Sequence, residues 1–170
     1  KTYNISGQLL ESETLNQGGI VKTAKEYYEN GELHKEYEPY SAEKGDFTEY
    51  FYTTEGRLDH KVLPNGESVT YSYSGLSTTV NSPRETRTET KDAYGLTDEV
   101  TDDGGTIDYS YYGDGNLHKV NYGKASYTFE YDEHGNRTKL TDPDAGEITS
   151  EYNAFDELVS QTDARGNTYT

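Results

Sequence analysis

The 170-residue sequence contains no cysteine, methionine or tryptophan and only 4 prolines. Without cysteine there can be no disulfide, thiolate metal site or thiol nucleophile. Basic residues are scarce, 15 against 32 acidic ones, and the net charge of −17 argues against a nucleic-acid binder or a partner for anionic lipid. No run of about 20 apolar residues is present, so no membrane-spanning helix is expected.

Hydrophobic residues make up 30% of the chain, too few for the thick single core of an α/β enzyme. The 18 tyrosines and 4 phenylalanines nevertheless bring the aromatic content to 13%, which is far too rich for a solvated, disordered tail. We therefore expect a folded chain with a thin core packed mainly by tyrosine and with many turns at its 17 glycines.

A repeat of about 20 residues runs through the chain, marked by a tyrosine, three residues and a glycine. Lys91 stands in the place of the tyrosine once, and Asp156 in the place of the glycine. The glycine positions are spaced by 24, 25, 19, 20, 20, 20 and 21 residues. This spacing divides one continuous repeat domain into longer, irregular repeats at 1–56 and regular ones at 57–170. The structural repeat anchors are Tyr3, Gly7, Tyr27, Gly31, Tyr52, Gly56, Tyr71, Gly75, Gly95, Tyr111, Gly115, Tyr131, Asp132, Gly135 and Tyr152.

Turns recur about every ten residues, and several share the pattern D-x-x-G, at 102–105, 132–135 and 163–166. An aspartate at the first position of a type I turn accepts a hydrogen bond from the backbone two residues on, and the glycine takes the positive φ that closes a three-residue hairpin loop. Residues 63–66 have a proline and a glycine in the same pattern. Between turns, apolar and polar residues alternate, as at Ile107, Tyr109 and Tyr111, which is typical of a half-buried strand.

Each repeat is therefore predicted to be one β-hairpin, and the chain to be all-β. We expect antiparallel hairpins of about 20 residues that form a long curved or spiralling single-sheet strip of up to sixteen strands, without a helix. The segment 84–92 departs from the pattern, with Thr86, Thr88 and Thr90 on one face. It is either a polar strand in register or a frayed connection.

The segment Y-D-E-H-G-N-R-T at 131–138, followed by Asp142, Gly146 and Ile148-Thr149, resembles the YD-repeat or RHS family. The resemblance implies a segment of a large secreted or surface bacterial protein whose repeats form a β-shell around a toxic C-terminal domain; relatives include teneurins and insecticidal toxin complex subunits. The family's self-cleavage element is absent after Tyr152, so neither autoproteolysis nor toxin activity carries over. The N-terminal third, for example 27–33, is also similar to MORN-type repeats.

No catalytic, cofactor or metal site is expected. Three of the four histidines, His34, His60 and His118, each precede a lysine, and an adjacent lysine repels a cation; the fourth is His134. An acidic segment with Asp142, Asp144 and Glu151 lacks the ligand spacing of a calcium loop. No carboxylate pair or nucleophile motif stands out.

The tyrosines remain as the candidate functional residues. Structurally, they are expected to form a ladder in which rings of successive repeats pack together. Functionally, Tyr111 and Tyr131 are possible ligand-stacking residues for sugar rings. The sequence thus predicts a non-enzymatic structural segment of a secreted or cell-surface protein, whose partners are neighbouring repeats and an effector domain of the same parent protein. The alternative is a carbohydrate- or protein-binding adhesion module. Nucleic-acid binding and membrane insertion are not expected.

Overall fold

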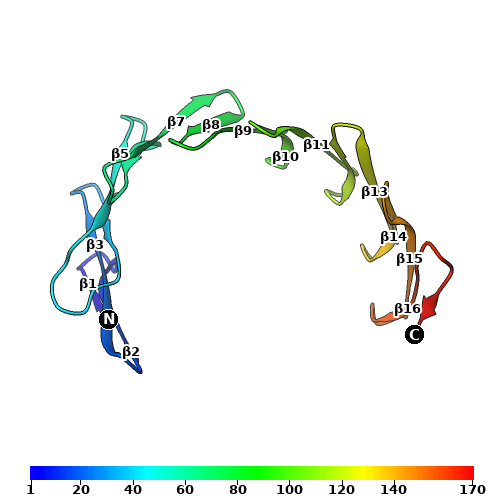
Figure 1. The fold of residues 1–170 in the computed structure, drawn as a ribbon, viewed down its shortest axis with the longest axis horizontal. Coiled ribbons are helices and arrows are strands. Elements are labelled where there is room, and N and C mark those ends of the chain that lie inside the picture. The colour runs from blue at the N-terminus through cyan, green and yellow to red at the C-terminus, as the bar shows by residue number, and fades with distance from the viewer. The chain divides into compact units, whose positions relative to one another are not determined.

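The computed structural model describes residues 1–170 and contains only strands, turns and short connections. Seventeen antiparallel strands form an open sheet, and the chain order can be followed in Figure 1. This confirms the predicted all-β class of antiparallel hairpins in a single sheet. No helix is long and apolar enough to cross a membrane. The strands are β1 Thr2–Tyr3, β2 Leu9–Asn16, β3 Gly19–Tyr27, β4 Leu33–Tyr37, β5 Phe47–Tyr52, β6 Leu58–Val62, β7 Ser68–Ser74, β8 Ser77–Asn81, β9 Thr86–Lys91, β10 Thr97–Asp102, β11 Gly105–Tyr111, β12 Leu117–Tyr122, β13 Ala125–Tyr131, β14 Arg137–Asp142, β15 Gly146–Tyr152, β16 Leu158–Thr162 and β17 Thr168–Tyr169.

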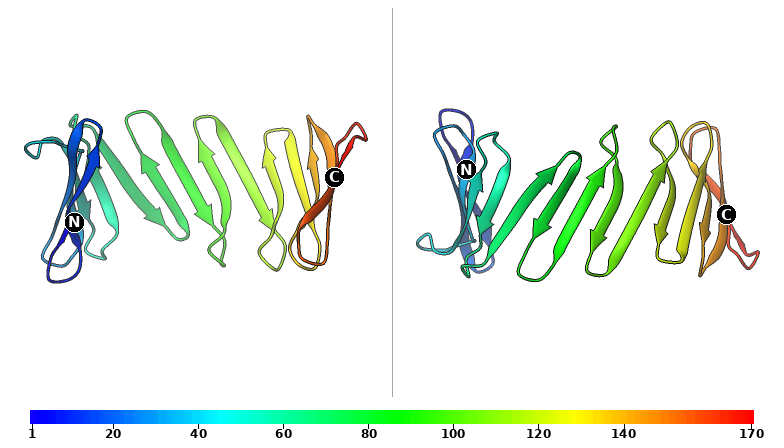
Figure 2. Two further views of the ribbon diagram at one scale, coloured as in Figure 1. Left: turned by 90° about the horizontal axis from the view of Figure 1, so that it is seen from below. Right: turned by 90° about the horizontal axis from the view of Figure 1, so that it is seen from above.

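The chain forms two compact units, residues 1–73 with 79–86, and residues 74–78 with 87–170. In the first unit β1 to β7 pair in chain order. In the second unit β9 to β17 do the same, and Figure 2 shows these hairpins following one another. The division of the repeats at residue 56 rests on spacing alone and stays a prediction.

The core is thin, since only Ala24, Val69 and Val100 are buried hydrophobic residues. In the second unit the register sets apolar residues directly opposite each other on neighbouring strands. Side chains of directly opposed residues lie on the same face of a sheet and contact each other. The apolar rows are Val100–Ile107, Tyr109–Val120–Tyr127 and Phe129–Leu140–Ile148.

The irregular spacing of the first repeats has two structural causes. β2 and β3 are the longest strands, with 8 and 9 residues, so their hairpin takes up more chain. Between β4 and β5, the connection 38–46 folds back on β3. There Tyr40 and Lys22 exchange two backbone hydrogen bonds of 2.8 and 3.0 Å, and the Tyr40 hydroxyl donates to Glu11 at 2.7 Å. The extra residues therefore cover β2 and β3.

Two sequence interpretations are settled by the strands. The segment 84–92 is a polar strand rather than a frayed connection, because β9 pairs with β10 through Thr88, Glu89, Thr90 and Lys91.

The expectation of a three-residue loop at 102–105 is wrong: Asp102 pairs directly with Gly105, which leaves a two-residue turn. Adjacent glycines at 104 and 105 allow this tighter turn, in which the Gly104 N–H donates to the Asp102 side chain at 2.7 Å.

Alkaline pH is expected to destabilise the first unit. Tyr37 donates its hydroxyl to Glu26 at 2.8 Å, and Tyr50 to Glu36 at 3.0 Å. Burial, and then the adjacent carboxylate, raise the pKa of both tyrosines from 10.0 to about 12. The folded chain thus retains protons that the unfolded chain releases, so the stabilisation is complete below pH 10 and is lost as the pH rises to about 12.

A double variant, Tyr37→Phe with Tyr50→Phe, removes both phenols and keeps both rings. Its melting temperature, followed by circular dichroism, should fall less between pH 10 and about 12 than that of the unmodified chain. Equal falls in the two proteins would contradict the assignment of the alkaline transition to these tyrosines.

Candidate functional site

Nine hairpin loops share one backbone geometry. In each, the N–H of the first residue donates to the carbonyl of the fifth, and the N–H of the fourth donates to the carbonyl of the first. The fourth residue is glycine with φ between 77° and 90° in eight loops and Asp156 with φ of 63° in the ninth. A left-handed residue at this position closes a three-residue loop with a bulge. The loops begin at Asn4, Tyr28, Thr53, Leu63, Asp92, Tyr112, Asp132, Asn153 and Asp163.

The side chain of the first loop residue fixes many of these turns. The Asp163 carboxylate accepts hydrogen bonds from the backbone N–H groups of Arg165 and Asn167, both at 2.9 Å. Asp132 does the same for His134 and Asn136, at 3.0 and 2.9 Å. The hydrogen bonds from Asn167 hold the pKa of Asp163 below its ordinary value. These aspartates therefore stabilise turns, and their oxygens are already engaged.

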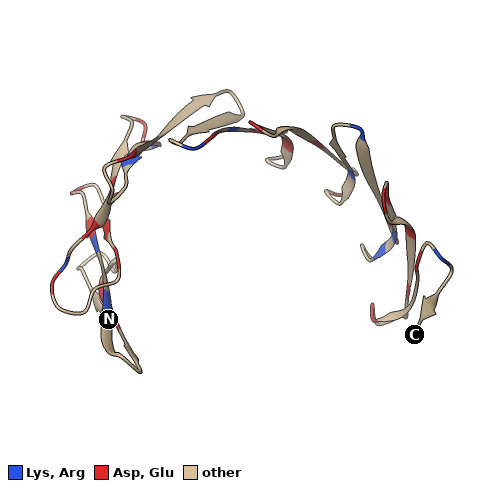
Figure 3. Cartoon of the chain, viewed as in Figure 1, with Lys and Arg blue, Asp and Glu red and all other residues tan.

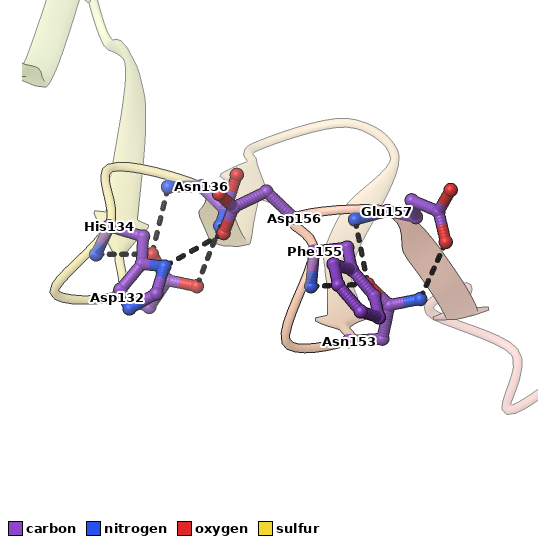
Figure 4. A network of polar contacts seen from close by, with 7 residues as sticks. All are labelled: Asp132, His134, Asn136, Asn153, Phe155, Asp156 and Glu157. Carbon is purple, nitrogen blue, oxygen red and sulfur yellow. Dashed lines mark hydrogen bonds and ion pairs between the residues drawn. The ribbon is translucent and has the colours of Figure 1, made fainter.

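Successive loops also contact each other through the residue after the glycine position. Gln8 donates to the Gly31 carbonyl in the next loop at 2.7 Å. In the second unit Asn136 donates to the Asp156 carboxylate at 2.8 Å, and the His134 Nδ1 lies 2.9 Å from the same oxygen (Figure 4). Hydrogen bonds from Asn136 and His134 lower the pKa of Asp156. One loop thus positions the next.

Tyrosine hydroxyls connect neighbouring repeats on the strands themselves. In each case a tyrosine near the end of one strand donates its hydroxyl to a backbone carbonyl of an earlier strand. The accepting residue is the first residue of that strand, and the distances are 2.8 to 3.1 Å. Each bond satisfies the polar end of a half-buried ring and fixes the spacing of two hairpins. The four pairs are Tyr27–Leu9, Tyr73–Leu58, Tyr111–Thr97 and Tyr152–Arg137.

Removal of one hydroxyl tests this contact. Tyr73→Phe should lower the free energy of unfolding by about 0.5–1.5 kcal/mol, the net value of one hydrogen bond, because the carbonyl of Leu58 loses its donor. Tyr71→Phe, on the same strand, is the matched control because the Tyr71 hydroxyl takes part in none of these bonds. Urea denaturation measures both, and equal losses would show that the hydroxyl of Tyr73 adds nothing.

The structure places the predicted anchors at three kinds of position. Gly7, Gly31, Gly56, Gly95, Gly115 and Gly135 occupy the left-handed position of the shared loop, and Gly75, with φ of 59°, lies in a two-residue turn between β7 and β8. A register shift directly precedes most anchor tyrosines. These tyrosines are Tyr3, Tyr27, Tyr52, Tyr111, Tyr131 and Tyr152.

The two candidate ligand-stacking residues are both half-buried. Tyr111 is held by its bond to Thr97, and burial raises its pKa. Tyr131 meets the ring of Tyr112 edge to face, with centroids 6.2 Å apart and an interplanar angle of 88°. The rings of Tyr111 and Tyr131 do not stack on each other, and their role in ligand stacking stays a prediction.

No group of three or more histidine, aspartate or glutamate side chains converges as metal ligands. His34 stacks on Tyr28 and contacts Glu49 at 2.8 Å, and His60 contacts Asp59 at 2.7 Å. The Asp142 side chain accepts from the N–H groups of Asp144 and Ala145, which is a turn contact.

Sequence reasoning missed an aromatic corner that occurs once in each unit. In the first, the Tyr28 ring stacks on His34 at 4.2 Å, meets Tyr52 edge to face at 6.3 Å and 87°, and donates its hydroxyl to the Tyr50 carbonyl at 2.9 Å. The signal was present as the pattern Y-Y-x-x-G-x-L-H-K, which occurs at 27–35 and again at 111–119.

The second corner repeats the first contact by contact. Tyr112 lies 4.5 Å from His118, meets Tyr131 edge to face, and donates its hydroxyl to the Phe129 carbonyl at 3.0 Å. In both corners the first tyrosine of a loop thus binds the strand of the following hairpin. Each corner therefore connects two repeats. Its two tyrosines also line a surface groove, one groove in each unit.

The paired hairpins and the contacts between consecutive repeats define an antiparallel β-hairpin repeat protein. Residues 111–147 match the family model described as RHS Repeat, which confirms the resemblance to the RHS family, and the chain carries an RHS repeat. No curated protein matches the sequence at a significant level.

Solved structures with a similar fold come from Tc toxins. The crystal structure described as TcdB2–TccC3 has a TM-score of 0.75 and 14% identity, covering 95% of this chain and 11% of that chain. The Tc holotoxin pore of Photorhabdus luminescens with a mutation in TccC3 has a TM-score of 0.73 and 13% identity, covering 96% and 11%. The crystal structure described as TcdB2–TccC3–TEV has a TM-score of 0.70 and 13% identity, covering 94% and 11%. This chain thus spans about a tenth of those chains, and the likeness is one of fold.

Proposed function

We propose that this RHS repeat segment is a non-enzymatic part of the wall of a β-shell, in a secreted or cell-surface protein. In that protein the shell encloses or presents a C-terminal effector domain. The observation that supports the proposal most is the fold likeness of nearly the whole chain to about a tenth of chains in Tc toxin structures. The partners proposed for the segment are neighbouring repeats and the effector domain of the same parent protein.

The contacts between repeats suit a wall. Each hairpin buries little by itself, since only Ala24, Val69 and Val100 are buried hydrophobic residues, so its stability depends on its neighbours. Hydroxyl-to-carbonyl bonds and loop-to-loop contacts are distributed along each unit rather than gathered at one place. The carboxylates with identified partners mostly accept hydrogen bonds in turns or form ion pairs with lysine, and none forms a buried acid pair of the kind that hydrolytic chemistry needs.

Limited proteolysis of the polypeptide that carries this segment with its flanking repeats tests enclosure. We expect the region after the repeats to resist protease in the native protein and to become sensitive in the same urea range in which the sheet unfolds. Cleavage of that region in the native protein, as fast as in the isolated region, would overturn the proposal.

The second candidate, an adhesion module that stacks sugars on tyrosine, is favoured by the groove between the loops that begin at Asp92 and Tyr112. This groove, of about 500 Å³, is lined by Tyr94, Tyr111 and Tyr112. A glycan array tests it: saturable binding that is lost in Tyr111→Ala, while the fold is kept, would favour adhesion over the wall.

A further inference from the structure

The first aromatic corner forms one wall of a groove with an acidic rim. The groove has a volume of about 700 Å³ and lies between the loops that begin at Tyr28 and Thr53. Glu29 and Glu32 line it together with the two tyrosines of the corner, and no lysine or arginine does. Glu32 Oε2 accepts from the Asn30 amide at 2.7 Å, whereas Oε1 is directed to the next loop, 3.2 Å from where a Cβ on Gly56 would be.

The second corner forms an equivalent groove in the other unit. Its volume is about 430 Å³, and its lining contains Tyr112 and Tyr131 with three acids, Asp114, Glu130 and Asp132. It too has no basic residue in its lining. Two basic residues of β14 lie beside it. Arg137 is directly opposite Tyr131, and Lys139 is 3.9 Å from Glu130 but is bound more closely by Glu147, at 2.7 Å.

Elsewhere in the chain, aromatic rings of the same sheet already hold cations. Three rings have a lysine or arginine above them at 4.2 to 5.2 Å from the ring centroid, a geometry in which the ring quadrupole attracts the positive charge. The pairs are Lys35–Phe47, Lys44–Tyr37 and Arg57–Tyr73. The two grooves present the same kind of ring, with added carboxylates, and neither lining contains a lysine or arginine of this chain.

We propose that the two grooves bind lysine and arginine side chains of a basic, extended peptide segment, each groove holding one cation between its aromatic corner and its acidic rim. Charge complementarity supports this occupant, since the chain has a net charge of −17 and acidic residues recur at its loops and strands (Figure 3). A sugar needs donors as well as acceptors. The rims offer mainly carboxylate acceptors, and the Asn30 amide is already bound to Glu32.

A peptide with several basic residues fits better than a single amine. An exposed cation–π contact and an exposed ion pair are each weak, so one bound side chain exchanges rapidly. When one basic side chain of such a peptide leaves a groove, the next basic side chain of the same peptide is still nearby and can replace it. The proposal does not rest on the proposed function, because the grooves belong to the folded 170-residue chain.

The test uses the whole chain and a capped hexa-arginine peptide, with hexa-citrulline as the neutral isostere. The groove variant neutralises four rim acids without changing their shape, and the control variant neutralises four exposed acids outside both grooves, so the net charge is equal. The groove variant is Glu29→Gln, Glu32→Gln, Asp114→Asn and Glu130→Gln; the control variant is Glu43→Gln, Glu85→Gln, Asp103→Asn and Asp144→Asn.

We expect calorimetric affinity for hexa-arginine to fall at least five-fold in the groove variant and less than two-fold in the control, with no binding of hexa-citrulline. Equal losses in both variants would show only general attraction to an acidic protein and would overturn the proposal. So would the absence of hexa-arginine binding to the unmodified chain.

A measurement on the unmodified chain makes the result independent of how the variants fold. In NMR titration with hexa-arginine, backbone amide shifts should be largest at groove-lining loop residues, namely Thr53, Thr54, Gly56, Gly113 and Asp114. Shifts spread evenly over acidic loops, or largest elsewhere, would overturn the two sites.

Discussion

Changing Gly146 to alanine is expected to lower the free energy of unfolding by about 2–4 kcal/mol. The substitution strains a left-handed backbone position and also overpacks a contact with the next loop, and the two costs add. Gly146 has φ of 85°, which is unfavourable for any residue with a Cβ. A Cβ at this position would also lie 2.6 Å from the Cβ of Ala164, in the loop between β16 and β17. Either the loop or the start of β15 must therefore move.

A second glycine provides the matched control for this prediction. Gly166 has nearly the same φ, 83°, but a Cβ there would meet nothing within 4 Å. Gly166→Ala should therefore cost only the backbone strain of about 1–2 kcal/mol. Urea denaturation gives both values, and Ala164→Gly added to Gly146→Ala should recover the difference. Equal losses for Gly146→Ala and Gly166→Ala would mean that the two loops are not in contact.

The contact between Gly146 and Ala164 has a wider meaning for this kind of fold. It brings two successive loops together at one end of the hairpins. The hydrogen bonds of Gln8 with Gly31 and of Asn136 with Asp156 bring other pairs of successive loops together in the same way. With so few buried residues, a chain of this kind is stable only if neighbouring hairpins support each other. Loop residues, which are usually tolerant of substitution, are therefore expected to be sensitive wherever they touch the next loop.

Local sequence chemistry predicted the hairpins well. The turn at 132–135 needs an acceptor at Asp132 and a left-handed residue at Gly135, and both requirements can be read from the residues themselves. The fold-back of 38–46 could not be read in this way. It depends on Tyr40 meeting Lys22, which is distant in sequence, and no local propensity encodes that contact.

The candidate site was predicted less completely, for the same reason. The position of the anchor tyrosines followed from the repeat, but the target of their hydroxyls did not. Tyr27 reaches a carbonyl 18 residues earlier and Tyr111 one 14 residues earlier, and a carbonyl is present at every residue. Only the spacing of the folded hairpins selects Leu9 and Thr97 as the partners.

Truncating Tyr111 is expected to cost more than any removal of a single hydroxyl. Tyr111→Ala should lower the free energy of unfolding by about 2–4 kcal/mol, because it removes a half-buried ring and leaves the Thr97 carbonyl without its donor. Tyr111→Phe keeps the ring and should lose only about 0.5–1.5 kcal/mol. Chemical denaturation separates the contribution of the ring from that of the hydroxyl.

Tyr94 is the control for a surface tyrosine, since it lies at the tip of a neighbouring loop and is 91% exposed. Tyr94→Ala should change the free energy of unfolding by less than about 0.5 kcal/mol. If Tyr111→Ala cost no more than Tyr94→Ala, the Tyr111 ring would be free for a ligand and the ladder interpretation would be wrong. A large loss for Tyr111→Ala would instead assign this tyrosine to the contact between repeats, and loss of sugar binding in that variant would then count for adhesion only where circular dichroism shows the sheet still folded.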